Sequence, residues 1–134
     1  MPPRLRTVAY VTRADALLVF EHRDYSDAGL QVPAGRLDPG ETLEQGLARE
    51  LQEEAGIRAE VVRELGALTR DHGEPYGVLE SHYFHLTTDD PRSEWEHVVT
   101  GDGDDAGFVF HYRFVPLDPP PQLAGRQGEF LHLL

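Results

Sequence analysis

The feature that most limits the fold of this chain is that only one stretch, residues 42–55, has the composition of a long helix. It is rich in Leu, Glu, Gln, Ala and Arg, which favour helix. Thr42 and Gln45 have the spacing of a capping box, and Gly56 suits a left-handed residue after the last turn. Elsewhere, apolar residues recur with strand spacing, which predicts strands over 7–12, 16–22, 30–37, 61–68, 82–86 and 108–117. Strands on both sides of one helix predict a mixed α/β fold.

The length of 134 residues fits a single domain, residues 1–134, with 40% hydrophobic residues to form its core. Because the chain has no cysteine, disulfides, thiolate nucleophiles and thiolate metal sites are excluded. Residues 89–107 are polar and acidic, and we expect a long loop there. Pro119 to Pro121 interrupt regular structure before a short final segment with helical character.

The net charge of −12 excludes several classes of partner. Nucleic acids and anionic membranes bind proteins mainly through Lys and Arg, so we expect neither as a partner. The longest apolar run, Ala16 to Phe20, is far shorter than the roughly 20 residues of a membrane-spanning helix. The apolar stretch near the N-terminus is also too short for a signal peptide, so a cytoplasmic protein is expected. A phosphate-bearing substrate would need a cation to bind to such an acidic chain.

Acidic residues of the predicted helix lie on its apolar side. On a helical wheel, Leu43, Leu47 and Leu51 form one stripe, and Glu54 falls inside it at about 20°. Glu50 lies on the edge of the stripe and Glu53 lies beside Glu50. Two carboxylates about 5 Å apart repel by roughly 3 kcal/mol at an effective dielectric of 20, and a divalent cation reverses that interaction. Hard oxygen ligands without sulfur favour Mg²⁺ or Mn²⁺.

The same wheel gives expectations for two neighbours of these carboxylates. Arg49 is predicted to point away from them and to clamp Glu41 of the preceding loop through a bidentate pair. Gly46 leaves space for a ligand or for a neighbouring loop.

Residues 35–57 resemble the Nudix box, G-x5-E-x7-R-E-U-x-E-E-x-G-U, in which U is apolar. Every fixed position agrees, and about one match in 10⁵ chains of this length is expected by chance. The order of strands around the box also resembles the Nudix α/β/α sandwich, with a mixed sheet and the Nudix loop-helix. The matching residues are Gly35, Glu41, Arg49, Glu50, Glu53, Glu54 and Gly56, with Leu51 and Ile57 at the apolar positions.

The resemblance implies a Mg²⁺- or Mn²⁺-dependent pyrophosphohydrolase. Its substrate would be a nucleoside diphosphate linked to another moiety, such as an ADP-ribose-like molecule, a dinucleoside polyphosphate or a nucleoside triphosphate, cleaved by metal-activated water attack on phosphorus. In the family, glutamates matching Glu50, Glu53 and Glu54 bind metal together with a backbone carbonyl, here that of Ala34. The alternative is a non-catalytic nucleotide-binding sensor, which the intact box disfavours. Many members of the family form dimers, so a homodimer is also compatible with the resemblance.

Several roles stay open at this level. Glu53 is the preferred general base and Glu50 the second, and a base from outside the box could be Glu80, Glu94 or Glu96, which are otherwise surface residues. Arg23 matches the place of a phosphate-binding residue in related enzymes, although a solvated strand end or a salt bridge with Asp24 or Asp27 is the ordinary interpretation. Tyr76 and Tyr83 could stack on a base, but structural roles are the ordinary interpretation.

Overall fold

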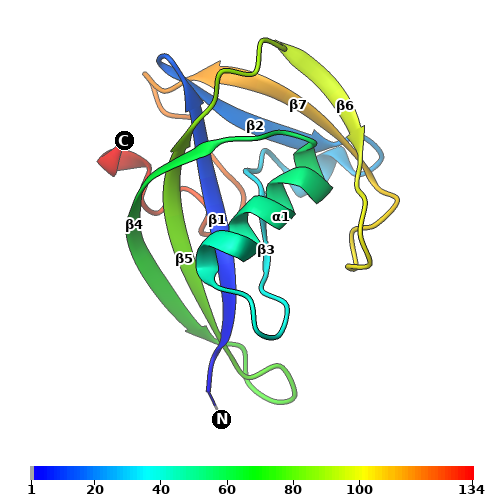
Figure 1. The fold of residues 1–134 in the computed structure, drawn as a ribbon, viewed down its shortest axis with the longest axis vertical. Helices are drawn as coiled ribbons and strands as arrows, with labels where there is room; N and C mark the ends of the chain where they lie inside the picture. Colours follow the sequence, from blue (N-terminus) through cyan, green and yellow to red (C-terminus); the bar gives the residue numbers. More distant parts are fainter. Residues whose placement is uncertain (1) are drawn as a thin grey trace.

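The computed structural model describes residues 2–134, which form one seven-stranded sheet, one long helix and two short 3₁₀ helices (Figure 1). The helices are α1 (Leu43–Ala55), η1 (Ser26–Ala28) and η2 (Leu131–Leu133). The strands are β1 (Arg4–Arg13), β2 (Ala16–His22), β3 (Ala34–Arg36), β4 (Glu60–Asp71), β5 (Val78–Thr87), β6 (Glu94–Val98) and β7 (Val109–Pro116).

The sheet is mixed and splits into two halves. Its strands follow the order β4-β5-β1-β2-β7-β6, and β3 also pairs with β1. The β1–β5 pair is parallel, whereas the other pairs are antiparallel. Strands β1 and β2 pair only next to their shared turn, at Thr12 with Leu17 and at Arg13 with Ala16. The halves β4-β5-β1 and β2-β7-β6 therefore diverge from this turn, with α1 packed against them (Figure 1).

Strand β1 lies in the middle of the sheet, and both of its faces are buried. Ala9 and Val11 pack with α1 in one cluster, and Val8 and Tyr10 pack in a second cluster with the C-terminal segment. Successive side chains of a strand point to opposite faces, so this alternation places α1 on one side and the C-terminal segment on the other. The predicted α/β sandwich is confirmed, and the predicted helical end of the chain is the short η2.

The local signals of the helix are also confirmed. The Thr42 hydroxyl accepts from the Gln45 amide at 3.1 Å, and the Gln45 side chain accepts from the Thr42 amide at 3.0 Å. Gly56 has a φ of 63° and a ψ of 36°, the left-handed conformation that glycine tolerates.

Two expectations are wrong. The strand predicted over 30–37 is reduced to β3 and one bridge at Gln31, because Pro33 lacks the amide hydrogen needed to continue the pairing. The loop predicted over 89–107 contains β6, whose inward residues are Trp95 and His97 and whose outward residues are exposed. The alternation is hard to recognise in the sequence because the exposed positions Glu94 and Glu96 are acidic, like the residues of the loop around them.

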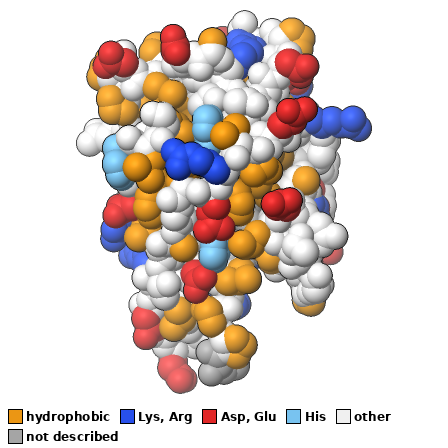
Figure 2. Space-filling model, turned by 60° about the vertical axis from the view of Figure 1, so that its left-hand side comes forward, with side chains coloured by type: hydrophobic (Ala, Val, Ile, Leu, Met, Phe, Trp, Pro, Cys, Tyr) orange, Lys and Arg blue, Asp and Glu red, His pale blue; other side chains and the backbone are white. Residues whose placement is uncertain are grey.

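The surface shown in Figure 2 carries charged side chains of both signs, with hydrophobic ones between them. Strand β4 forms one edge of the sheet and exposes Val61 and Val62. Within residues 2–134, none of the helices combines the length and the apolar character needed to cross a membrane.

Candidate active site

One cavity of about 450 Å³ gathers acidic residues from three parts of the chain. It lies between β3, α1 and the loop that follows β6, and we call it the acidic cavity. Ala34 and Gly35 of β3 line it, as do Arg6 and Arg36. Its acidic residues are Asp38, Glu50, Glu53, Glu54, Asp102, Asp104 and Asp105. The three box glutamates are therefore brought together as predicted.

The end of α1 that carries these glutamates is held by hydrogen bonds to its last carbonyl groups. Such groups have no partner within a helix and need one from outside. The carbonyl of Glu53 accepts from the Thr100 amide, and that of Glu54 accepts from the Tyr112 hydroxyl, both at 2.9 Å. The Trp95 indole donates to the carbonyl of Ala55 at 3.0 Å. Strands β6 and β7 and the loop between them thus fix the direction of the glutamates.

Glu54 is the most buried of the three glutamates, with 3% of its surface exposed. Burial raises the pKa of Glu54 well above its usual range, and a hydrogen bond with Glu50 and the charges of Glu50 and Asp105 raise it further. The Ala34 amide donates to the Glu54 carboxylate and lowers the pKa in part. Burial also raises the pKa of Glu53. Desolvated carboxylates at one place need a compensating cation.

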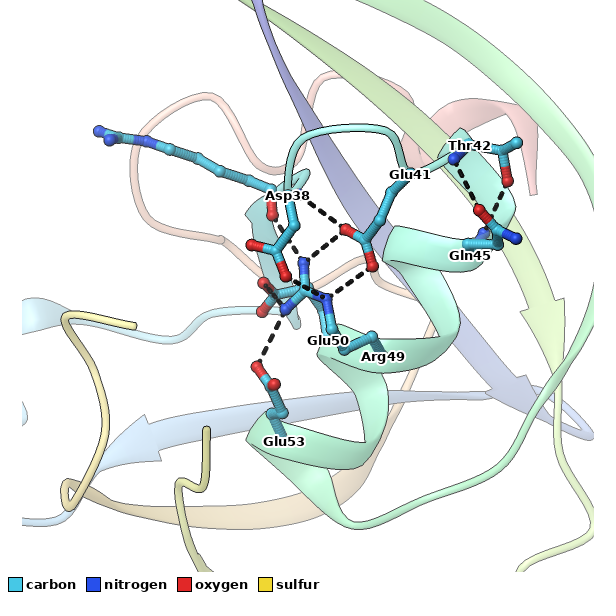
Figure 3. A network of polar contacts seen from close by, with 8 residues as sticks. Asp38, Glu41, Thr42, Gln45, Arg49, Glu50 and Glu53 are labelled. Atoms are coloured by element: carbon cyan, nitrogen blue, oxygen red, sulfur yellow. Dashed lines mark hydrogen bonds and ion pairs between the residues drawn. The ribbon is translucent and has the colours of Figure 1, made fainter. Parts of the chain in front are cut away.

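Arg49 supplies part of that compensation (Figure 3). Its Nε and Nη2 donate to the two oxygens of Glu41 at 2.8 and 2.9 Å, which is the predicted bidentate pair. Its Nη1 donates to Glu50 at 2.9 Å and to Glu53 at 3.0 Å. The prediction that Arg49 points away from the carboxylates is therefore wrong. A guanidinium has donors on two edges and a long stem, so it reaches groups on both sides of its wheel position.

The loop before α1 is fastened to the same network. Glu41 also accepts from the Asp38 amide at 2.7 Å, and Arg49 donates to the carbonyl of Arg36 at 2.9 Å. A Cβ on Gly46 would stand 3.0 Å from Leu37 and 3.4 Å from Glu41. The space at Gly46 is thus filled by the neighbouring loop, one of the two predicted occupants.

Two glycines allow the glutamates to lie against backbone. A Cβ on Gly35 would stand 2.1 Å from the carboxylate carbon of Glu50. A Cβ on Gly101, which has a φ of +93°, would stand 2.5 Å from that of Glu53. Two residues without side chains therefore leave the room that the carboxylates of Glu50 and Glu53 occupy.

Sequence reasoning missed the acidic loop as part of this site. Asp102, Asp104 and Asp105 were visible only as a charge run, and nothing local indicates that the loop folds back against α1. The alternation in β6 was the one available signal. The base candidates from outside the box, Glu80, Glu94 and Glu96, do not line the cavity. Glu80 contacts His82, Glu94 contacts His111, and Glu96 contacts Arg23. Arg23 also pairs with Asp24, as its alternative interpretation held.

The donor set of the acidic cavity fits a hard divalent cation, because carboxylate and carbonyl oxygens are the ligands such ions prefer. Glu54 in particular is a buried carboxylate whose charge a cation would stabilise. Within residues 2–134 no three acidic or histidine side chains are arranged so that they could hold an ion. Arg49 contacts Glu50 and Glu53, so metal binding would require these side chains to turn.

Comparison with known proteins assigns the family. A family model described as NUDIX domain matches residues 2–134. The chain is 28% identical over 120 residues to an NAD-capped RNA hydrolase NudC of Klebsiella pneumoniae, covering 90% of this chain and 44% of that protein. It therefore spans less than half the length of this curated relative. It is 40% identical to the human 8-oxo-dGDP phosphatase NUDT18 over 44% of this chain and 21% of that protein.

The fold is also shared with solved structures. An ADP-ribose pyrophosphatase from Streptococcus suis superposes with a TM-score of 0.66 at 22% identity, covering 98% of this chain and 89% of that chain. At this identity the likeness concerns the fold alone.

Proposed function

Because this chain belongs to the Nudix family, we propose that it is a Mg²⁺- or Mn²⁺-dependent pyrophosphohydrolase formed by a single domain, residues 1–134. Its substrate would be a nucleoside diphosphate linked to another moiety, and its reaction would be attack of water on phosphorus. The observation that carries this proposal is the buried Glu54 beside Glu50 and Glu53 in the acidic cavity. Such a cluster destabilises the fold unless it binds a cation.

The carboxylates of Glu50, Glu53 and Glu54 and the Ala34 carbonyl would hold the metal. A bound divalent ion neutralises phosphate oxygens and lowers the pKa of bound water, which makes that water a nucleophile near neutral pH. Without such a cation, the acidic residues of this cavity would repel a diphosphate.

The remaining roles fall to the chain itself. We assign the proton-accepting role to Glu53, with Glu50 as the second choice, because burial raises the pKa of Glu53 toward the range of a useful base. Arg49 and Glu41 are positioning residues, since their bidentate pair fixes the loop 37–41 against α1. Asp102 and Asp105 are further candidates for metal binding because they line the same cavity.

The class of substrate remains a proposal. The names of the relatives include an RNA cap, a nucleotide and ADP-ribose, all of which contain a diphosphate. The net charge of −12 favours a small nucleotide over a long polyanion. The absence of nucleic acid and membrane partners, the homodimer, the cytoplasmic location and the phosphate contact of Arg23 stay predictions.

The test is a panel of ADP-ribose, diadenosine polyphosphates and nucleoside triphosphates, incubated with Mg²⁺, with Mn²⁺ or with EDTA. Phosphate released after coupling to a phosphatase measures turnover. We expect metal-dependent turnover of at least one class. Absence of turnover on the whole panel, with nucleotide binding retained, would instead identify the sensor.

A further inference from the structure

A second cavity, of about 290 Å³, borders the acidic cavity and has the opposite charge. The two cavities share Arg6 and Leu79. Arg70, Arg126 and His72 also line the second one, and its lining residues include neither Asp nor Glu. We call it the basic cavity. Because the chain has only 12 basic residues against 24 acidic ones, three arginines around one small cavity are a strong local excess.

The sheet register explains how these arginines meet. On β5, Leu79 and Ser81 are two residues apart and share a face. Arg70 of β4 lies opposite Leu79, whereas Arg6 of β1 lies opposite Ser81. Residues opposite each other share a face, so Arg6 and Arg70 project on the same side of the sheet. With strands about 4.8 Å apart and a rise of about 3.3 Å per residue, their Cα atoms are roughly 12 Å apart, within joint reach of one anion.

The third arginine comes from the C-terminal segment. The Tyr83 hydroxyl donates to the carbonyl of Arg126 at 2.7 Å, which fastens this residue over β5. Tyr83 has 3% of its surface exposed, and the charges of Arg6, Arg126 and Arg70 all act on it. The three arginines therefore line one cavity together with this buried tyrosine.

Arg6 lacks a partner that would explain its position. Within residues 2–134, its guanidinium forms no hydrogen bond or ion pair, and neither does that of Arg70. Burial lowers the pKa of Arg6, and the charges of Tyr83, Glu54 and Asp105 oppose that shift only in part. Arg36 of β3 lies directly opposite Arg6, and like charges in that relation destabilise a sheet. Only Arg126 is paired, with the exposed Glu129 at 3.0 Å.

We propose that the basic cavity binds a second phosphate group of the substrate, a phosphomonoester carried about one sugar away from the diphosphate that is cleaved. This proposal rests on the proposed function, because the acidic cavity next to it would hold the diphosphate. Arg6 lies at the boundary and contacts both parts, whereas Arg70 and Arg126 select for the added phosphate. Arg70 and Arg126 do not line the acidic cavity, so a role in balancing its negative charge would not explain their positions.

The first experiment measures binding without metal or cleavage. Calorimetric titration in EDTA compares AMP with adenosine 2′,5′-bisphosphate and adenosine 3′,5′-bisphosphate, which differ from AMP by one phosphate at different positions. We expect one of the bisphosphates to bind at least tenfold more tightly than AMP, and the better of the two locates the phosphate. Equal affinities for all three would overturn the proposal.

Variants of the arginines in the basic cavity test whether the preference for the bisphosphate arises there. The double variant Arg70→Gln with Arg126→Gln changes exposed side chains and is expected to reduce the bisphosphate preference to less than threefold. The control Arg113→Gln removes a half-buried arginine that pairs with Glu21 on another part of the sheet, and should keep the preference. A full preference in the double variant would show that the phosphate binds elsewhere.

The second experiment measures turnover of two matched pairs, NADP⁺ against NAD⁺ and coenzyme A against its 3′-dephospho form. We expect kcat/KM to be at least tenfold higher for the phosphorylated member of one pair. Turnover with no such preference would overturn the phosphate site and leave the hydrolase proposal intact. A binding preference for one bisphosphate without turnover of any diphosphate would overturn the hydrolase proposal and leave the phosphate site intact.

Discussion

The acidic and basic cavities are neighbours that share two residues, yet they treat charge in opposite ways. In the acidic cavity, Arg49 contacts Glu41, Glu50 and Glu53, so part of the charge is balanced within the chain. In the basic cavity, Arg6 and Arg70 have no such partner within residues 2–134. The excess charge of each cavity is what its ligand must neutralise, a cation in one and an anion in the other. The charge that the chain leaves uncompensated in each cavity thus indicates the class of ligand that the cavity binds.

The largest expected effect comes from the acidic side. Glu54→Gln should lower kcat by a factor of 10² or more, because the amide keeps the shape of the side chain but loses its charge. Turnover of the best substrate with Mg²⁺ measures this effect, and Glu44→Gln, at the exposed start of α1, is the matched control. Metal-free binding of the adenosine bisphosphates should not weaken, because the substitution removes a negative charge and leaves the basic cavity intact. An unaltered rate would refute the role of the acidic cavity, and loss of bisphosphate binding would refute the independence of the two cavities.

The next effect concerns the internal cation of the acidic cavity. Arg49→Lys keeps the charge but cannot form the bidentate pair with Glu41 while contacting Glu50 and Glu53. We expect the free energy of unfolding to fall by about 2 kcal/mol, as for the loss of charge-assisted hydrogen bonds. Urea denaturation monitored by circular dichroism measures this change. Unchanged stability would mean that Arg49 does not hold the loop 37–41 against α1.

A smaller effect is expected at Gly101, which lies against the Glu53 carboxylate. Gly101→Ala introduces a Cβ against the Glu53 carboxylate at a φ of +93°, and should destabilise the protein by about 1 kcal/mol and lower kcat severalfold. Gly107→Ala in the same loop is the control, because Gly107 has a similar φ of +90° and its Cβ would meet no atom within 4 Å. Equal effects of the two substitutions on stability and rate would show that contact with Glu53 is irrelevant.

The last prediction is a dependence on pH. Because the pKa of Glu54 is raised in the folded protein, the folded state binds its proton more tightly than the unfolded state does. The contribution of Glu54 to the free energy of unfolding should therefore be fully present below the ordinary value of 4.5 and should be lost as pH rises through the raised pKa. Metal-free denaturation at a series of pH values, compared with Glu54→Gln, isolates this group. Parallel curves for the two proteins would show that Glu54 keeps an ordinary pKa.

Predictions from the sequence succeeded where the cause was local or periodic. The capping box of Thr42 and Gln45 depends on residues three positions apart, and the burial of Glu54 follows from the geometry of one helix. They failed where the course of a long, flexible side chain decided the contact. The wheel gives the direction of a Cβ, but Arg49 bends along its stem to reach Glu50 and Glu53.

By itself, the sequence determined the central helix, the carboxylates on its inner side and the membership of a family, because these depend on spacing within about 23 residues. Only the tertiary structure decided that Asp102 and Asp105 join those carboxylates and that Arg6, Arg70 and Arg126 line one cavity with Tyr83. The physical reason is that strand register and the packing of the C-terminal segment bring together residues as many as 120 positions apart. No periodic pattern in the sequence predicts that these residues lie close together.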